Sequence, residues 1–259
     1  MRLHSATVLA GTILFGTVLA GLGASSSVAQ EKRQAAGAPS QITTVLELFT
    51  SQGCSSCPPA DALMHSYAGR KDVIALSLPV DYWDYLGWKD TLANPKFSAR
   101  QRYYAKERGD GRVYTPQMVV NGRAHVNGSS AAAIDEAIIG TRAEMAREHV
   151  PVQVRMDGHH ILIETGEAPT GSPHREATIW LVTLHKETEV KIERGENRGK
   201  TVKYYNVVRD MSPIGMWSGK AGKLELSRDA VAEPGNELCA VILQIGKAGP
   251  IVGAAVSGL

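Results

Sequence analysis

A pair of cysteines set between a predicted strand and a predicted helix constrains this chain more than any other feature. Residues 42–49 are rich in apolar and β-branched side chains, with turn-forming residues on both sides, which is typical of a buried strand. From Ala60 onward, apolar residues recur at spacings of three and four, the period of a helix with one buried face. Cys54 and Cys57 therefore lie in the turn that joins the two elements.

This position favours thiol chemistry. The unpaired N–H groups and partial positive charge of a helix N-terminus stabilise a thiolate, and such settings lower the pKa of cysteine to roughly 3.5 to 7.5. We expect Cys54, at the edge of the turn, to be the exposed nucleophile, and Cys57, one turn further on, to be the buried resolving thiol. Pro58 suits the first turn, where a fixed φ helps and no amide hydrogen is needed.

Other interpretations of the cysteine pair stay open. A permanent structural disulfide would close a very small loop and remove little unfolded-state entropy, so redox activity is favoured. A zinc site usually needs a second pair of ligands at matching spacing, and only Cys239 and scattered histidines are available. Copper binding by the two thiolates and His125 is a weaker alternative. The main prediction therefore includes no metal and no cofactor.

The N-terminal segment predicts export. Arg2 and His4 precede an apolar, small-residue stretch over residues 6–24, and Ser27-Val28-Ala29 has the small-x-small pattern of a cleavage site. We interpret residues 1–29 as a signal peptide that is cleaved after Ala29, with an uncleaved membrane anchor as the alternative. After cleavage no transmembrane segment is expected, and the protein would be periplasmic or secreted.

Charge and cysteine usage agree with this prediction. Removing Arg2 from the 28 basic residues leaves 27 against 26 acidic ones, a near-neutral balance that does not suggest nucleic acid as a partner. Export would place the cysteine pair where disulfides form and persist. Cys239 lies within an apolar run, residues 238–243, and we expect it to be a buried free thiol.

The mature chain divides into two parts beyond a flexible N-terminus at residues 30–40. Residues 41–149 alternate strands and helices in the order β-α-β-α-β-β-α, and Asn121-Gly122 predicts a tight hairpin between the third and fourth strands. The predicted strands are 42–49, 72–80, 117–120 and 123–126, and the helices begin near residues 60, 95 and 131.

Residues 150–259 contain short alternating strands with Gly, Pro and Asn turns, which predicts a β-rich, sandwich-like second domain. A protein partner could bind through this domain. The expected strands are 152–156, 161–165, 177–185, 189–194, 201–209, 223–226, 238–246 and 252–256.

Three long motifs resemble one known family. They are Glu47–Asp61 (ELFTSQGCSSCPPAD), Val80–Asp90 (VDYWDYLGWKD) and Val113–Val120 (VYTPQMVV), with a further similarity at Gly195–Arg209. Together they are similar to the domain of unknown function 1223 family (DUF1223), secreted bacterial proteins of the thioredoxin-like superfamily. The resemblance implies a thioredoxin-like α/β N-terminal domain, export and a paired C-x-x-C, but no settled activity.

The resemblance also implies a substrate site. In thioredoxin-like proteins the proline that opens the third strand is commonly cis and lies opposite the cysteines, so Thr115 and Pro116 would hold the extended chain of a substrate. Asp81, Tyr82 and Trp83 could line a groove beside the cysteines. Equally, the aromatic side chains of this loop could pack it onto the second domain.

The sequence therefore predicts an exported thiol–disulfide oxidoreductase that uses Cys54 and Cys57 on protein or small-molecule thiols and disulfides. The alternative from another class is a non-catalytic binding or assembly module with an inert disulfide. A weaker alternative is a copper-binding protein that delivers metal.

Overall fold

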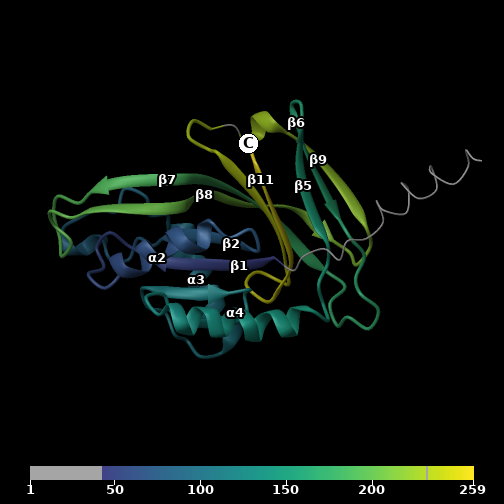
Figure 1. Ribbon diagram of the computed structural model, residues 1–259, viewed down its shortest axis with the longest axis horizontal. Coiled ribbons are helices and arrows are strands. Elements are labelled where there is room, and N and C mark those ends of the chain that lie inside the picture. Colours follow the sequence, from purple (N-terminus) through teal and green to yellow (C-terminus); the bar gives the residue numbers. More distant parts are fainter. Residues whose placement is uncertain (1–42, 232) are drawn as a thin grey trace, which may run out of the picture. The chain divides into compact units, whose positions relative to one another are not determined.

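An eight-stranded mixed sheet dominates this computed structural model, which describes residues 43–231 and 233–259 (Figure 1). The strand order is β11-β10-β7-β8-β2-β1-β3-β4. The strands are β1 (Thr44–Thr50), β2 (Val73–Pro79), β3 (Gln117–Val120), β4 (Ala124–Asn127), β7 (Ala177–Lys191), β8 (Thr201–Trp217), β10 (Leu238–Gln244) and β11 (Ile251–Gly258).

A second, three-stranded sheet and three α-helices complete the described part of the chain. The sheet consists of β5 (Val152–Asp157), β6 (His160–Thr165) and β9 (Gly222–Ser227). The helices are α2 (Pro58–Ala68), α3 (Pro95–Arg108) and α4 (Ala131–Met145), with short 3-10 turns η1 (Asp84–Leu86) and η2 (Arg228–Ala230). The predictions for residues 1–29 and 30–40 lie outside the described residues. Within the described residues, no helix is both long enough and apolar enough to cross a membrane.

The first half of the chain has the predicted element order from β1 to α4. Strand β1 lies between β2, which is parallel to it, and β3, which is antiparallel. Asn121 and Gly122 follow β3 with positive φ angles of 52° and 65°, a backbone that Asn-Gly adopts readily. The Arg123 amide donates to the Val120 carbonyl, and the paired ends of β3 and β4, Val120 and Ala124, are separated by three residues.

Both faces of β1 are buried because helices cover the two sides of the sheet at this point. Side chains that alternate along a strand point to opposite faces. Leu46 and Leu48 pack with Met64 of α2 and Ile134 of α4. On the other face, a larger core contains Val45, Phe49, Phe97 of α3 and Tyr104 of α3 together with residues of β7, β8, β10 and β11.

The second half of the chain extends the same sheet. Val207 of β8 pairs with Ser77 of β2 in parallel register, and the Ser77 hydroxyl donates a 2.7 Å hydrogen bond to the Tyr205 carbonyl. The residues that the structure describes belong to one compact unit, and the large sheet takes strands from both segments of the chain. That the segments 41–149 and 150–259 are separate domains stays a prediction.

The β-rich half places two sheets face to face. Ile161 and Ile163 of β6 share a buried core with Ile179 of β7, Val241 of β10 and Val252 of β11. The second sheet lies at the right of Figure 1. Cys239 lies in this core as a buried free cysteine, as predicted, and burial raises the pKa of its thiol to about 11.

Two strand predictions were wrong in the same region. The segments 177–185 and 189–191 belong to one strand, β7, which ends at Lys191 and leaves residues 192–194 outside it, and β8 continues beyond residue 209 to Trp217. The register of the β7–β8 pair shifts between Ile179 and Trp180 and again between Thr183 and Leu184. A bulge accommodates one extra residue without ending the pairing. The β7–β8 hairpin therefore continues through Pro213 and through the polar residues of both strands.

A buried ion pair joins the two halves of the main sheet. Arg100 of α3 donates to both carboxylate oxygens of Glu47 on β1, at 2.5 and 3.1 Å, and also to the side-chain oxygen of Gln244 on β10, at 2.9 Å. The Tyr104 hydroxyl donates to Glu47 and accepts from Gln244. We call these four residues the Glu47 cluster; neither oxygen of its carboxylate lacks a partner.

Candidate functional site

Cys54 and Cys57 form a disulfide at the start of α2. Thr50 ends β1, and the amide of Cys54 donates to the carbonyl of Ser51, which closes a tight turn. Cys57 is the N-terminal capping residue of α2, and its carbonyl accepts from the amides of Ala60 and Asp61. The strand, turn and helix predicted from the sequence are all present, and the pair is oxidised.

Both sulfur-bearing residues are buried, which corrects the expectation that Cys54 is exposed. Cys54 is 1% exposed and Cys57 is fully buried, whereas Ser55 and Ser56 between them are exposed. The Ser56 hydroxyl lies 3.4 Å from the Cys54 sulfur. Two chain segments distant in sequence contact this turn.

One of these segments is the loop between β7 and β8. The Asn197 side-chain amide donates to the backbone carbonyls of Gln52, at 2.9 Å, and Cys54, at 2.8 Å. Its own oxygen accepts from Lys200 at 2.9 Å. Asn197 is 1% exposed, so the charged loop that contains it packs closely on the cysteine turn.

The predicted substrate residues Trp83, Thr115 and Pro116 lie beside this turn. A Cβ placed on Gly53 would lie 2.9 Å from the Trp83 Cβ, so the turn and Trp83 are in close contact. The Trp83 indole donates to the Thr115 hydroxyl at 2.8 Å, and the bond between Thr115 and Pro116 is cis.

Pro116 also lies near the first turn of α2. The Cβ atoms of Pro116 and Ala60 are 3.2 and 3.3 Å from the point that a Cβ on Gly128 would occupy. The structure therefore brings the cysteine turn, Trp83 and the Thr115–Pro116 segment together.

Asp81 and Tyr82 point to α3 instead of the cysteines. The Ser98 hydroxyl donates to the Asp81 carboxylate, and the Asp81 amide donates to Ser98. The Tyr82 hydroxyl donates to the Gln101 side chain at 3.1 Å, and burial raises the pKa of Tyr82. Both side chains anchor the loop to the helix.

A buried acid, Asp61, lies one helical turn after Cys57. The Thr50 hydroxyl donates to one of its oxygens at 2.7 Å, and the other oxygen is buried without a hydrogen-bond partner among the described residues. Burial raises the pKa of Asp61 to about 8, with a smaller contribution from the negative charge of Asp90. The carboxyl group is therefore mostly protonated at neutral pH.

Asp90 and Trp88 hold the backbone just before the cysteines. The Gln52 amide donates to Asp90 at 2.8 Å, and the Trp88 indole donates to the Gln52 side-chain oxygen at 2.7 Å. Burial raises the pKa of Asp90. We call Gln52, Asp61, Trp88, Asp90 and Asn197 the turn cluster.

Asp61, Asp90 and Asn197 were not selected as site residues from the sequence. Asp61 carried a usable signal, since it lies on the helix face that also carries Met64 and Ala60, where an unpaired acid is unusual. Asn197 carried none, because its role depends on contacts with residues 143 and 145 positions earlier.

His125, the third ligand in the copper alternative, is held by other groups. Its Nε2 lies 3.1 Å from an Asp110 oxygen, and its Nδ1 lies 2.9 Å from the Tyr114 hydroxyl. Burial lowers the pKa of His125. Over residues 43–231 and 233–259, no group of three or more His, Cys, Asp or Glu side chains is arranged to hold a metal ion.

Fold and site together define a class: a mixed α/β protein with a large mixed sheet, a second sheet and a disulfide at a helix N-terminus. Residues 45–244 match the sequence profile described as "Protein of unknown function (DUF1223)". The chain belongs to this family, as its motifs indicated.

Solved structures agree with the family assignment. An X-ray structure of a protein from Agrobacterium tumefaciens is 35% identical, with a TM-score of 0.73 over 82% of this chain and 92% of that one. HBP35 of Porphyromonas gingivalis shares the fold at 12% identity, with a TM-score of 0.57 over 85% of this chain and 76% of that one. None of the curated proteins compared with this chain gives a significant match.

Proposed function

We propose that this protein is an exported thiol–disulfide oxidoreductase of thioredoxin-like architecture, in which Cys54 and Cys57 exchange with protein or small-molecule thiols and disulfides. The observation that carries the proposal is the disulfide at the N-terminus of α2, where a released thiolate faces unpaired amides and the positive end of the helix. The position of Thr115 and Pro116 near the cysteine turn supports it.

The exchange starts from the oxidised form. A substrate thiolate attacks the Cys54 sulfur, the Cys54–Cys57 bond breaks, and Cys57 leaves as a thiolate while a mixed disulfide forms on Cys54. A second thiolate of the substrate attacks the substrate sulfur of the mixed disulfide and releases Cys54. Two electrons have then passed from the substrate dithiol to the protein, and the reverse sequence reduces a substrate disulfide.

In this proposal, Asp61 donates and accepts the proton that Cys57 gains and loses during the exchange. It lies one helical turn after Cys57, and burial raises the pKa of its carboxyl group to about 8. Asp61 therefore carries a proton at neutral pH that can pass to the departing Cys57 thiolate. The same carboxylate accepts the proton when Cys57 attacks.

Access to Cys54 requires a local movement, because the sulfur-bearing residue is 1% exposed. The loop between β7 and β8 holds the turn through Asn197, and Trp83 contacts it at Gly53. Trp83 and Thr115 then form the surface that a substrate chain meets when the turn opens.

The reduction potential of the pair tests the proposal. The Cys239→Ala variant, which retains only the two cysteines of the site, is equilibrated with glutathione buffers, and its thiols are trapped and counted by mass. We expect a potential between about −270 and −120 mV, the range of exchanging oxidoreductases. A potential below about −300 mV would contradict the proposal. In parallel, Cys54→Ser should abolish disulfide reduction, while Cys57→Ser should accumulate a mixed disulfide.

A second function is favoured by one observation, the burial of both cysteines. A binding or assembly module with a permanent disulfide has no need of an open sulfur, and its β-rich half would bind a partner. The two functions differ in a measurable way, because Cys54→Ser would then leave partner binding unchanged and the potential would lie below about −300 mV.

A further inference from the structure

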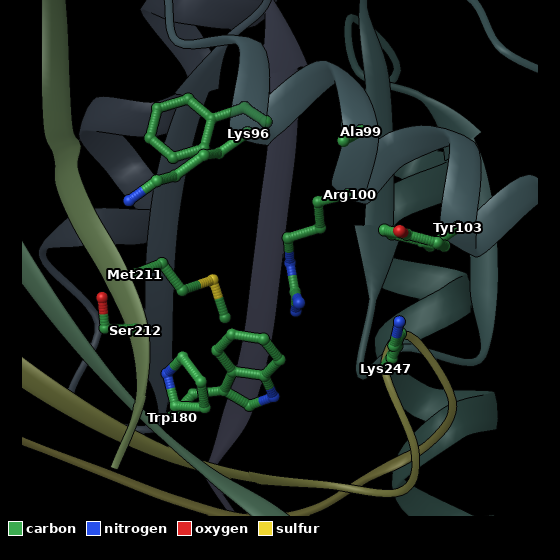
Figure 2. Close-up of a pocket in the computed structure, with 10 residues that line it drawn as sticks. Lys96, Ala99, Arg100, Tyr103, Trp180, Met211, Ser212 and Lys247 are labelled. Carbon is green, nitrogen blue, oxygen red and sulfur yellow. The ribbon is translucent and has the colours of Figure 1, made fainter.

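A cavity of about 370 Å³ lies on the opposite side of the main sheet from α2 and α4, between α3 and the strands β7 and β8 (Figure 2). Its apolar wall includes Phe97 of α3, Trp180 of β7 and Met211 of β8. Lys96 of α3 and Lys247, which follows β10, contribute the cationic part of the lining. The cavity contains no residue of the cysteine turn, so a ligand bound in it is independent of the proposed function.

The alternation of side chains along β7 explains why Trp180 faces this cavity. Ile179 and Leu181 pack in the core between the two sheets, whereas Trp180 and Val182 point to the opposite face, toward α3. The neighbouring bulge lies on β8, where Ile214 is the extra residue between the partners of Ile179 and Trp180. Trp180 lies below Arg100 in Figure 2, with its ring 5.6 Å from the guanidinium carbon.

The charges around the cavity do not balance. Arg100 is matched by Glu47 at 2.5 Å, and Lys96 is matched by Asp210 at 3.0 Å. The Lys247 ammonium lies 5.3 Å from the centre of the Tyr103 ring, and no ion pair involves it within the described residues. Of the three cations that line the cavity, Arg100 and Lys96 are paired with acids, whereas Lys247 is an exposed side chain with no ion pair among the described residues.

We infer that this cavity binds an apolar monocarboxylate, with its hydrocarbon part on Phe97, Trp180 and Met211 and its carboxylate at Lys247. A volume of 370 Å³ holds about a dozen groups of water size, which corresponds to an aliphatic chain of about eight to ten carbons with its head group. A mostly apolar wall with a few placed polar groups is the usual composition of small-molecule sites. The Lys247 ammonium, which has no ion-pair partner among the described residues, favours a negatively charged head group.

The test compares three ligands that share one chain and differ in charge: decanoate, decanol and decylammonium. Each is titrated into the full-length mature protein by calorimetry, below its micelle concentration, with tryptophan emission as a second readout. We expect decanoate to bind one per chain and up to about fivefold more tightly than the other two, the largest effect that one exposed ion pair usually gives. Equal affinity for all three ligands would overturn the proposal.

Variants locate the binding. Lys247→Gln should weaken decanoate binding about fivefold and leave decanol binding unchanged, whereas Lys71→Gln, an exposed lysine of the loop before β2, should alter neither. Ala99→Trp on α3 should abolish decanoate binding because the larger side chain fills the cavity. If Ala99→Trp fails to fold, Ser212→Phe fills the same space from β8. Full decanoate affinity in a folded, cavity-filled variant would contradict the assignment.

Discussion

Two buried carboxyl groups, Glu47 and Asp61, have contrasting surroundings in this fold. Glu47 is fully buried and Asp61 is 1% exposed, so both lose the solvation that a charge requires. Glu47 faces Arg100, which donates to both of its oxygens. Asp61 accepts one hydrogen bond from a hydroxyl group, has one unpartnered oxygen among the described residues, and burial raises its pKa to about 8. Burial raises the pKa of an acid when no cation offsets the lost solvation.

The two clusters also differ in what they connect. The Glu47 cluster joins β1, α3 and β10, so it stabilises the main sheet across both halves of the chain. The turn cluster joins the cysteine turn to the loop between β7 and β8 through hydrogen bonds to backbone carbonyls. We expect the Glu47 cluster to determine the free energy of unfolding. We expect the turn cluster to determine how stability depends on pH and how readily a reductant reaches the disulfide.

The largest effect is expected from Glu47→Gln. The change leaves the Arg100 guanidinium buried without a counter-charge, and because arginine stays protonated the group cannot neutralise itself. The free energy of unfolding should fall by about 3–5 kcal/mol, measured by urea denaturation at pH 7.

Two controls sharpen this prediction. The double variant Glu47→Gln/Arg100→Met should recover much of the loss, because no unpaired charge remains. Glu187→Gln breaks an exposed pair with Lys203 and should cost less than about 1 kcal/mol. A loss below about 1 kcal/mol for Glu47→Gln alone would show that the buried pair is not what holds the sheet.

The next effect concerns the pH dependence of stability. The folded protein holds a proton on Asp61 up to a pKa of about 8, whereas the unfolded chain releases it near pH 4. Stability should therefore fall as the pH rises through this window. Asp61→Asn removes this dependence, so between pH 5 and 8 the wild type should lose about 3 kcal/mol more than the variant.

Chemical denaturation at several pH values between 5 and 8 measures this difference. Glu193→Gln, which neutralises an exposed carboxylate, is the matched control and should follow the wild-type curve. Parallel curves for wild type and Asp61→Asn would mean that the Asp61 carboxyl group is ionised throughout this range.

The smallest effect is expected at Asn197. Replacing it with alanine removes two hydrogen bonds to the turn, and the disulfide should be reduced by dithiothreitol about tenfold faster, which corresponds to about 1.4 kcal/mol. Asn236→Ala removes a similar bond, to the Val231 carbonyl, in the loop before β10, and should leave the rate unchanged. Equal rates for Asn197→Ala and the wild type would show that the loop does not control access.

Much of the fold could be predicted from local patterns. The strand, turn and helix around the cysteines follow from periodicity, and the hairpin at Asn121-Gly122 follows from the positive φ that these residues tolerate. The continuity of β7 could not be predicted, because residues 186–188, which join the two predicted strands, are polar and exposed or half-buried. Hydrophobic periodicity does not predict those parts of a strand that lie outside the hydrophobic core.

The site was less predictable than the fold. The Cys54 carbonyl accepts a hydrogen bond from Asn197, which is 143 positions away, so no local pattern contains this contact. Asp81 and Tyr82 follow the strand that neighbours the cysteine turn, but their partners on α3, Ser98 and Gln101, turn them elsewhere. Glu47 did carry a signal, since an acid within an apolar strand requires a cation, although the identity of Arg100 came only from the tertiary structure.

The pairing of β2 with β8 affects how the chain is made. The two strands meet through Ser77 and Val207, so one side of β2 has no strand to pair with until the ribosome has synthesised about four-fifths of the protein. An apolar strand with an unpaired edge readily joins another chain. Factors that hold nascent chains apart should therefore matter most for this protein between the completion of β2 and the emergence of β8.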